Sequence, residues 1–577
     1  MGSTMYLQRV QLGNFRSFDS ARLELQKDLT VFVGENNGGK SNAIDAIRLL
    51  TAPLSGRREL YCEPTDIRFQ CGACHFELEA HFSGLSAGQQ CRLLSAATDA
   101  SMTSACFGLR YDGSQVGAKP ILWAGKEGNP PEANCRDMVR HVYLPTLRDA
   151  KRALASGNPT RIMALLHHFL EGTSADELAK ELGRSHSHDV LTKVDTAVEK
   201  GLAALTGGVR RQTASLGFAA DEALIDIARD LRFKLADHGV DPEDLRYSGH
   251  GYANLLFMAI IAVELEKVRT ADLTLFLVEE PEAHLHPQLQ AAVLSFLREQ
   301  AKQSRETPPT DHGPAGELQV IVATHSPNLS AWVSSDRLVV FKSVITSSSQ
   351  RATGEEEAEP ASLDAEIIGN VLPSDTPACS EAGVDSVAAA ISAPRRATRC
   401  MPLANMPLAE GDRRKVDRYL DVTKAALLFG GRALLVEGIA EALLLPTIAK
   451  HHVLKGQPEK LRLFRSAVFI PIDGVDFAPY VTLLLTELEG ARIAERVVVV
   501  TDGDKGLRID DEEDADADPD AANEVTEASE DDDTAHSIED DEAVIPGERR
   551  KAALEKLAKD MSANDRFAAI TSTYSLE

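Results

Sequence analysis

Residues 34–41 read G-E-N-N-G-G-K-S and match the spacing G-x-x-x-x-G-K-[ST] of a phosphate-binding loop. An apolar run at 29–33 precedes them, and an apolar period typical of a helix follows at 42–50, which is the context that this motif requires. Backbone N–H groups of such a loop, with the N-terminus of its helix, surround a phosphate. The alternative is a glycine turn before an ordinary helix. We expect nucleotide contacts from Asn36, Asn37, Gly38, Gly39, Lys40, Ser41 and Asn42.

The last two residues of this loop have separate roles in a phosphate site. We expect Lys40 to reach the β- and γ-phosphates and Ser41 to bind Mg²⁺. A weaker motif, Y-S-G-H-G at 247–251, precedes a long apolar helical run. Ser248 and the neighbouring backbone N–H groups could therefore also contact a phosphate.

Two apolar runs further along the chain end in residues that suit the same nucleotide. The run at 273–278 leads into Glu279 and Glu280, and the run at 318–323 leads to His325. One carboxylate at such a strand end can hold Mg²⁺ and the next can orient the attacking water, so we assign these roles to Glu279 and Glu280. We expect His325 to sense the γ-phosphate. The alternatives are a charged strand end and a structural histidine.

A second group of carboxylates follows apolar runs in the last third of the chain. Glu437 ends the run RALLV, Glu441 lies one helical turn later, Asp473 follows VFIPI, and Asp502 and Asp504 follow RVVVV. Strands that alternate with helices predict a parallel sheet, whose sites lie at the carboxyl ends of the strands. Carboxylates without Cys or His suit hard cations such as Mg²⁺ or Mn²⁺. Such ions support phosphodiester cleavage.

Composition sets limits on these interpretations. The chain has 577 residues, enough for two or three domains, and a net charge of -27. Residues 510–542 hold 18 acidic residues and no Lys or Arg, so the remainder carries only about -9. Any DNA contact must therefore come from local basic patches. With no apolar run of transmembrane length and no signal-peptide pattern, we expect a cytoplasmic protein without membrane contacts.

Eight cysteines are too few and too scattered for a disulfide scaffold of this length. One cluster comprises Cys71-Gly-Ala-Cys74-His75, with Cys62 and Cys91 nearby. Structural thiols, a zinc site and c-type haem attachment are the three alternatives. Haem attachment normally requires export, which the sequence does not signal, and the spacing is irregular for zinc.

The motifs GENNGGKS, SGHG, LFLVEEPE and VATHSP occur in the order and spacing of the Walker A, signature, Walker B and switch-histidine elements of ABC-type ATPases. Together with NFRSF and EEPEAHLHP, they resemble the SMC/RecF branch and, more closely, the overcoming-lysogenisation-defect (OLD) family of ATP-dependent nucleases. The resemblance implies ATP as the nucleotide. It also implies a dimer or tetramer, because the signature of one subunit completes the loop of another.

The later segments ALLFGGRALLVEGIAEALLLP and PIDGVDF resemble the Toprim domain of the same family. This resemblance implies a metal-dependent DNA endonuclease with Glu437, Glu441, Asp502 and Asp504 as ligands for Mg²⁺, Mn²⁺ or Ca²⁺; Glu437, Asp502 and Asp504 would be catalytic. It also suggests antiphage defence and a helicase or other defence partner. The family continues beyond a Leu-Glu such as Leu576–Glu577 with a catalytic lysine, so the catalytic basic residue stays open.

We predict an α/β protein in which an ABC-type P-loop ATPase with an inserted helical arm precedes a Toprim domain with a Rossmann-like parallel sheet. The predicted segments are the ATPase at 5–145 and 246–342, a helical insertion for dimerisation at 146–245, a linker at 343–412, and the Toprim domain at 413–577 with a disordered acidic insert at 510–546. A small antiparallel lobe is expected within 57–123.

Two other functions fit parts of these patterns. The first is an SMC/RecF-like ATPase that clamps DNA and carries an inactive Toprim scaffold. The second is another Toprim chemistry, strand passage or primer synthesis. Strand passage requires a nucleophilic tyrosine on a partner domain, and the sequence shows no such module. Arg16, beside the nucleotide loop, could contact phosphate or base, or could be a solvated turn residue.

Overall fold

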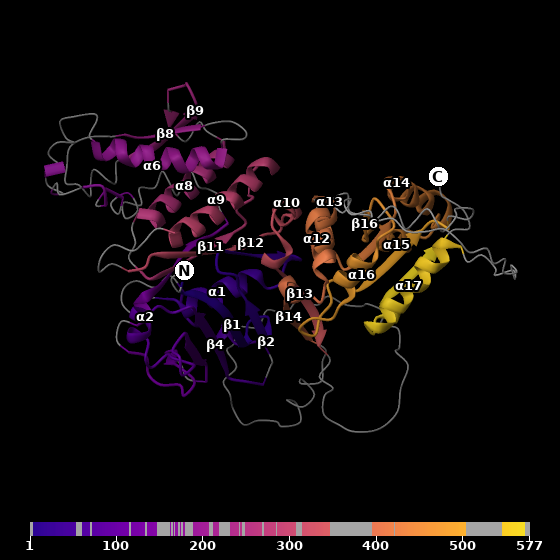
Figure 1. Ribbon diagram of the computed structural model, residues 1–577, viewed down its shortest axis with the longest axis horizontal. Coiled ribbons are helices and arrows are strands. Elements are labelled where there is room, and N and C mark those ends of the chain that lie inside the picture. Colours follow the sequence, from indigo (N-terminus) through magenta and orange to yellow (C-terminus); the bar gives the residue numbers. More distant parts are fainter. Residues whose placement is uncertain are drawn as a thin grey trace, which may run out of the picture. The chain divides into compact units, whose positions relative to one another are not determined.

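The computed structural model describes residues 4–52, 60–69, 72–114, 117–132, 135–146, 162, 165–166, 168–170, 174, 177–178, 189–206, 212–217, 231–241, 243–244, 249–267, 271–283, 285–306, 314–346, 395–420, 422–503 and 545–571. The chain forms two compact units, residues 1–405 and 406–577. Figure 1 labels their helices and strands. Among the described residues, none of the helices combines the length and apolarity that a membrane crossing requires.

A six-stranded sheet with the order β14-β13-β3-β12-β11-β7 carries the nucleotide motifs of the first unit. Its strands are parallel except for β14, which pairs antiparallel to β13. All residues of β3 and β12 are buried, which is the pattern of a parallel sheet covered on both faces. The strands are β3 (Leu29–Gly34), β7 (Val139–Leu144), β11 (Leu273–Glu279), β12 (Glu317–Ala323), β13 (Leu338–Thr346) and β14 (Arg395–Pro402).

An antiparallel sheet with the order β2-β1-β4-β5-β6 forms the small lobe. Burial alternates along β4, so one face of this sheet packs on the core. That core also contains α1 (Lys40–Leu50) and residues of the six-stranded sheet, so the lobe and the nucleotide-binding sheet share one hydrophobic cluster. The strands are β1 (Tyr6–Phe15), β2 (Phe18–Glu24), β4 (His75–Ser83), β5 (Ser104–Asp112) and β6 (Ile121–Ala124).

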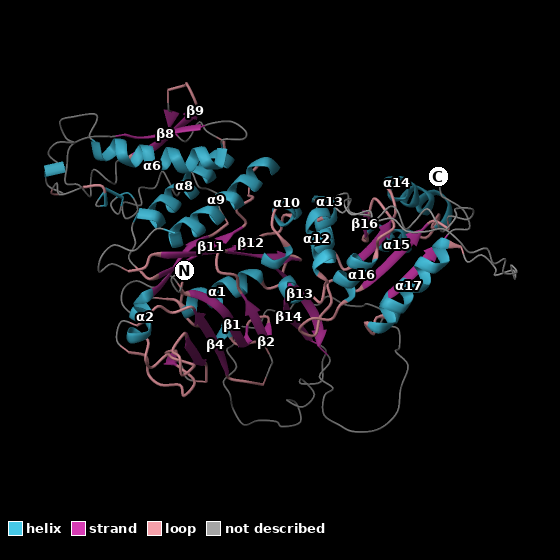
Figure 2. Ribbon diagram, in the orientation of Figure 1, coloured by secondary structure: helices cyan, strands magenta, loops and turns pink. Residues whose placement is uncertain are grey.

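Helices accompany these sheets in the first unit. They are α2 (Ala87–Arg92), α6 (Asp189–Thr206), α8 (His250–Lys267), α9 (Pro287–Glu306) and α10 (Pro327–Ala331). Short 3-10 helices cover Pro64–Asp66, Arg136–Met138, Ser335–Arg337 and Leu403–Asn405. Figure 2 shows α6, α8 and α9 as neighbouring helices.

The insertion predicted to be helical contains a three-stranded sheet as well as α6. The strands β8 (Gln212–Gly217), β9 (Arg232–Asp237) and β10 (Glu243–Asp244) pair antiparallel in the order β10-β9-β8. Buried Phe233 and Leu235 flank exposed Lys234, which is the period of a half-buried strand. The helical prediction was therefore wrong for residues 212–217 and 232–237, because short apolar runs fit both patterns.

The predicted linker at 343–412 differs from the structure at both of its ends. Strand β13 continues to Thr346, and β14 is an integral strand of the six-stranded sheet. Ala397, Cys400 and Met401 are buried there, so this polar-looking segment contributes to the core. The boundary between the units falls after Asn405. Residues 347–394 lie outside the described residues.

The second unit is built on a parallel sheet with the order β16-β15-β17-β18, as the alternation of strands and helices predicted. Its strands are β15 (Arg432–Val436), β16 (Val468–Pro471), β17 (Arg496–Thr501) and β18 (Phe567–Thr571). The helices are α12 (Glu410–Tyr419), α13 (Val422–Ala425), α14 (Ile439–Ile448), α15 (Pro458–Arg465), α16 (Ala478–Leu485) and α17 (Pro546–Asp560). A 3-10 helix spans Ala426–Leu428 and a π-helix spans Ala449–Val453.

Candidate nucleotide and metal sites

Glycines shape the loop between β3 and α1. Gly39 has φ 96° and stands directly before α1, and a Cβ there would lie 2.6 Å from Thr398 Oγ1. Only glycine adopts this conformation and fits this space without cost. Gly38 and Gly39 are buried, whereas the side chains of Asn36, Asn37 and Ser41 are exposed. The loop therefore leaves polar groups accessible beside the helix N-terminus, as a phosphate site requires.

Lys40 is almost completely buried at the first position of α1. Its Nζ donates to the carbonyl oxygens of Gly34 at 2.7 Å and Glu35 at 2.9 Å, and lies 3.2 Å from His325 Nδ1. Burial lowers the pKa of Lys40 to about 8, and the carboxylates of Glu280, Glu282 and Glu35 oppose that shift. The ammonium is thus held inside the loop, next to the position of the expected phosphates.

The acidic end of β11 and the end of β12 meet beside this lysine. The two strands are in parallel register with Glu279 opposite Ala323, and the Glu280 N–H donates to the Ala323 carbonyl at 2.8 Å. His325 Nε2 lies 3.6 Å from Glu280 Oε1. Burial and Lys40 lower the pKa of His325, which Glu280 opposes, and the imidazole lies between the lysine and Glu280.

Two supporting residues in this site were not predicted. Tyr143, in the neighbouring β7, donates its hydroxyl to Glu279 Oε2 at 3.0 Å. Glu282 Oε1 accepts from Thr324 Oγ1 at 2.7 Å and from the His325 N–H at 3.0 Å, and burial raises the pKa of Glu282. Glu282 therefore orients the backbone before His325. The motif EEPE contains Glu282, so the sequence did contain a signal for this residue. Strand β7, which contains Tyr143, has no motif that would have identified it.

Arg16 forms ion pairs rather than remaining a solvated turn residue. It has φ 45°, and its guanidinium donates to Asp45 Oδ2 at 2.6 Å and Asp66 Oδ1 at 2.8 Å. It therefore ties the β1–β2 turn to α1 immediately behind the loop. Asn42 Nδ2 donates to Ser17 Oγ at 2.9 Å, so this predicted nucleotide contact has an intramolecular partner.

Several predicted positions lie outside the described residues. These are Ser248 of the signature motif, Cys71 of the cysteine cluster and Asp504 of the second acidic group. Their roles stay predictions. The described cysteines of the cluster, Cys62, Cys74 and Cys91, are not in disulfides.

In the second unit, Glu437 and Asp502 follow adjacent parallel strands, β15 and β17. Glu437 Oε1 accepts from the Asp502 N–H at 2.7 Å and from the Thr501 hydroxyl. Arg550, on α17, donates to the Asp502 carbonyl at 2.8 Å, and its Nη2 lies 3.4 Å from Glu437 Oε1. Burial raises the pKa of Glu437, while these donors and Arg550 oppose the shift. No sequence motif pointed to Arg550.

Glu441 and Asp473 are oriented differently from these two residues. Glu441 is buried, and its Oε2 accepts from the Gly438 N–H at 2.9 Å, which caps α14. Asp473 is largely exposed and lies 3.3 Å from Nζ of buried Lys424. The metal-binding role of Glu441 therefore stays a prediction, and its observed contact is with the backbone.

The donor sets fit the cations that the motifs imply. Ser41 is exposed at the start of α1, and Glu437 and Asp502 follow the adjacent strands β15 and β17. Oxygen donors of this kind suit Mg²⁺ or Mn²⁺. In the part of the chain that the structure describes, however, these acids do not form a group of three with all ligand atoms within 4.8 Å.

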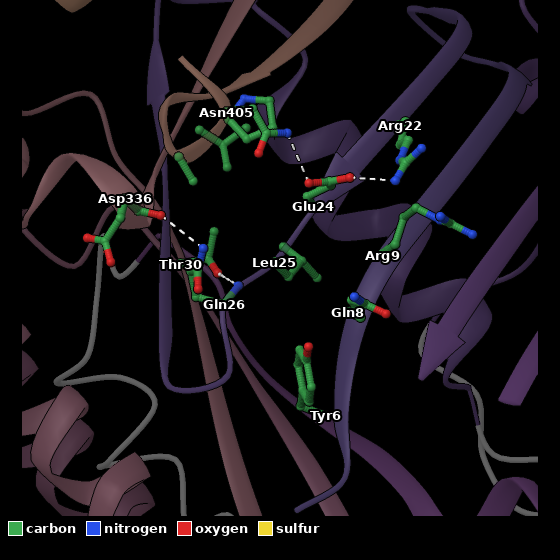
Figure 3. A pocket seen from close by; sticks show the side chains of 13 residues that line it. Tyr6, Gln8, Arg9, Arg22, Glu24, Leu25, Gln26, Thr30, Asp336 and Asn405 are labelled. Carbon is green, nitrogen blue, oxygen red and sulfur yellow. Dashed lines mark hydrogen bonds and ion pairs between the residues drawn. The ribbon is translucent and has the colours of Figure 1, made fainter. Parts of the chain in front are cut away.

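A polar hollow of about 200 Å³ in the first unit is separate from the nucleotide residues (Figure 3). Glu24 stands in it between Arg22, at 2.7 Å, and Asn405, at 3.0 Å. Gln26 donates to the Asp336 carbonyl at 3.0 Å. These contacts join β2 to the chain that leaves β14, so we read the hollow as a structural junction.

Comparison with known proteins agrees with the motifs. A family model for the AAA ATPase domain matches residues 5–71 and 174–329. The Old nuclease of Escherichia phage P2 is 25% identical over 357 residues, covering 56% of this chain and 57% of that protein. The chain resembles the OLD nucleases. The OLD nuclease of Thermus scotoductus is likewise 25% identical over 346 residues, covering 56% of this chain and 59% of that protein.

The predicted resemblance to the OLD family is thus confirmed, and the chain spans a little over half of the length of these OLD nucleases. A RecF protein of Gloeobacter violaceus is 45% identical over only 53 residues, 9% of this chain and 14% of that protein. An SmcHead bound to the C-winged helix domain of ScpA has a TM-score of 0.40 at 18% identity, covering 59% of this chain and 93% of that chain. The AAA ATPase match and the parallel sheets confirm the predicted α/β P-loop class.

Proposed function

We propose that this chain is an ATP-regulated, metal-dependent DNA endonuclease with a Toprim-type second unit. The observation that carries the proposal is the pairing of Glu437 with the Asp502 N–H at the carboxyl ends of β15 and β17. Ligand and catalytic sites of parallel sheets form at this edge. The similarity to OLD nucleases supports the same activity.

In the first unit, Lys40 binds the nucleotide phosphates, while Ser41 and Glu279 are the residues that would hold Mg²⁺. Glu280 accepts a hydrogen bond from the attacking water, and His325 couples that carboxylate to Lys40. The observed distances of 3.2 Å from His325 to Lys40 and 3.6 Å to Glu280 support this arrangement. Mutual orientation of these groups contributes to hydrolysis by holding the water in line with the phosphate.

In the second unit, Glu437 and Asp502 would hold the cation, together with Asp504 and Glu441 as predicted ligands. Bound Mg²⁺ or Mn²⁺ would supply Lewis-acid assistance to phosphodiester hydrolysis. Thr501 and the Asp502 N–H orient the Glu437 carboxylate through the hydrogen bonds described above. Arg550 supplies positive charge next to the DNA phosphate.

The proposal also includes the oligomeric state, the biological role and the partners of the protein. A homodimer or tetramer would let the signature segment around Ser248 contact nucleotide bound to another subunit. Antiphage defence in the cytoplasm, with a helicase or other defence partner, follows from the family resemblance. DNA is the expected substrate, and ATP is expected to regulate its cleavage.

Incubation of supercoiled plasmid with Mn²⁺ or Mg²⁺, with and without ATP, tests the nuclease activity. We expect the wild type to nick or linearise the plasmid and Glu437→Ala to lose at least about 100-fold of that rate. Glu459→Ala, which removes an exposed carboxylate from α15, is the matched control. Lys40→Ala then reports whether nucleotide restrains or activates cleavage.

The main alternative is a DNA-clamping ATPase with an inactive second unit. An intact plasmid under every condition, combined with ATP-dependent retention on DNA, would support that alternative. Cleavage that persists unchanged in Glu437→Ala would instead place the activity elsewhere and overturn the assignment of this site. Nucleotide incorporation would indicate primer synthesis.

A further inference from the structure

Three side chains on the antiparallel lobe converge without a role in either site described above. They are Glu79 and His81 on β4 and Cys106 on β5. One ligand atom from each lies within 4.8 Å of the other two. Within the described ranges, this is the only group of three His, Cys, Asp or Glu residues with that property.

Backbone pairing, rather than flexible side chains, creates this convergence. Cys106 is directly opposite His81 in the antiparallel β4–β5 pair, so both side chains lie on the same face. Glu79 is two residues from His81 on the same strand, which places it on that face as well. On the other side of β4, β1 pairs Arg9 with His81. The register of three strands therefore fixes the cluster.

Three polar groups compete for one ring nitrogen of His81. Its Nε2 lies 2.9 Å from Glu79 Oε2, 3.2 Å from Gln11 Nε2 and 3.8 Å from Cys106 Sγ. A neutral imidazole nitrogen either donates one hydrogen bond or accepts one. The carboxylate requires a donor at Nε2, whereas the Gln11 amide group requires an acceptor. A cation between these groups would use the nitrogen lone pair, the carboxylate and the sulfur at once.

The charges and burial favour a cation in the same place. Cys106 is 2% exposed. A divalent ion with one thiolate, one carboxylate and one neutral imidazole gives a net charge of zero. Such a site avoids an uncompensated charge at a buried position.

The sulfur–nitrogen distance is close to that expected around zinc, whereas the nitrogen–oxygen distance is that of a direct hydrogen bond, and the carboxylate would move about 0.5 Å to admit the ion. Tetrahedral Zn²⁺ with ordinary bond lengths places its nitrogen and oxygen ligands about 3.4 Å apart and its sulfur and nitrogen ligands about 3.6 Å apart. The corresponding distances here are 2.9 Å and 3.8 Å. A Cys, a His and a carboxylate form a ligand set that suits zinc among the divalent ions. The side chains of His81 and Glu79 are 18% and 27% exposed, so water can reach the cluster.

We propose that Glu79, His81 and Cys106 bind one Zn²⁺ ion, with water as the fourth ligand, and that this ion joins β4 to β5 in the lobe. This site differs from the cysteine cluster weighed from the sequence, which involves Cys62, Cys71, Cys74 and Cys91. It is also independent of both the nucleotide loop and the carboxylates of the second unit.

Metal analysis of the full-length protein tests the proposal. After equilibration with Zn²⁺ and removal of free metal, we expect about one zinc ion per wild-type chain. His81→Gln and Cys106→Ala should lose that ion. Cys91→Ser, which changes an exposed cysteine on α2, and Cys74→Ser should retain it. Loss of zinc from Cys74→Ser but not from Cys106→Ala would assign the metal to the other cluster and overturn the proposal.

Replacement of zinc by Co²⁺ provides a test that does not depend on the folding of a variant. A thiolate ligand produces a sulfur-to-cobalt charge-transfer band in the near ultraviolet, which we expect in the wild type. Its absence from a stoichiometric Co²⁺ complex would overturn the participation of Cys106. His81→Gln changes a half-buried surface side chain, and circular dichroism with ATP binding will show that it is folded. A folded His81→Gln variant that retains full zinc affinity would likewise contradict the site.

Discussion

Lys40 Nζ lies 3.2 Å from His325 Nδ1, which connects the phosphate-binding loop to the end of β12. Because the lysine also donates to two loop carbonyls, the histidine is not its only support. We therefore predict that His325→Ala lowers the ATPase kcat about 10- to 100-fold and changes ATP affinity by less than about threefold. Steady-state hydrolysis and equilibrium binding of a fluorescent ATP analogue measure the two effects.

Lys40→Ala is the comparison for this first prediction. It removes the ammonium that is expected to contact the phosphates, so the affinity for ATP should fall. An equal loss of ATP affinity in His325→Ala would contradict the separation of roles, since the histidine would then support nucleotide binding rather than hydrolysis.

Glu280 differs from its neighbour Glu279 in its partners. Glu279 accepts from the Tyr143 hydroxyl, whereas Glu280 is 3.6 Å from His325 and partly exposed. We predict that Glu280→Gln binds ATP but hydrolyses it about 100-fold or more slowly, because an amide is a poor acceptor for the proton of water. Single-turnover hydrolysis checks this. Glu299→Gln on the exposed side of α9 is the charge-matched control and should hydrolyse ATP normally.

Much of the nucleotide site follows from local sequence, because its residues stand at the ends of apolar strands. Gly39, Lys40 and Glu280 could be predicted in this way. Tyr143 could not, since its contact with Glu279 depends on β7 lying next to β11 in the sheet. Sheet neighbours that are distant in sequence leave no periodic signal.

Contacts between residues that are distant in sequence also explain the larger differences between the predicted and the observed fold. Strand β14 pairs with β13 across 347–394, a separation that no local pattern records. Arg550 reaches Glu437 from a helix more than a hundred residues later in the chain. The prediction of a helix over residues 232–237, which form β9, was wrong for another reason. A six-residue apolar alternation is also compatible with a helix.

Arg550 offers a test of the second site that rests on the proposed nuclease activity. Its guanidinium contacts the Asp502 carbonyl at 2.8 Å and lies 3.4 Å from the Glu437 carboxylate. We predict that Arg550→Ala lowers metal-dependent plasmid cleavage about 10-fold or more. Arg549→Ala removes the same charge from an exposed neighbour and should cleave at the wild-type rate. An equal loss of cleavage rate in both variants would indicate that Arg550 acts only through general electrostatic attraction of DNA, and would contradict a specific role at this site.

Glu317 provides a prediction about stability rather than activity. It begins β12 and is 6% exposed, and its Oε2 has no hydrogen-bond partner among the described residues. Burial raises the pKa of Glu317 to about 7, with a further contribution from Asp272 that Arg305 opposes. An unfolded glutamate has a pKa of about 4.3. Between these two values the folded state binds more protons, so the free energy of unfolding should fall as pH rises through this window.

Replacing this carboxyl with an amide should remove that pH dependence. At pH 8 the wild type carries a buried charge, so Glu317→Gln should be more stable by about 1–3 kcal/mol, whereas at pH 4 the two proteins should be nearly equal. Urea denaturation at both pH values measures the difference between variant and wild type. Glu299→Gln, an exposed carboxylate on α9, should show no comparable gain. A Glu317→Gln variant that is destabilised at pH 8 would indicate that the charged carboxylate stabilises the start of β12, and would contradict the direction of the pKa shift.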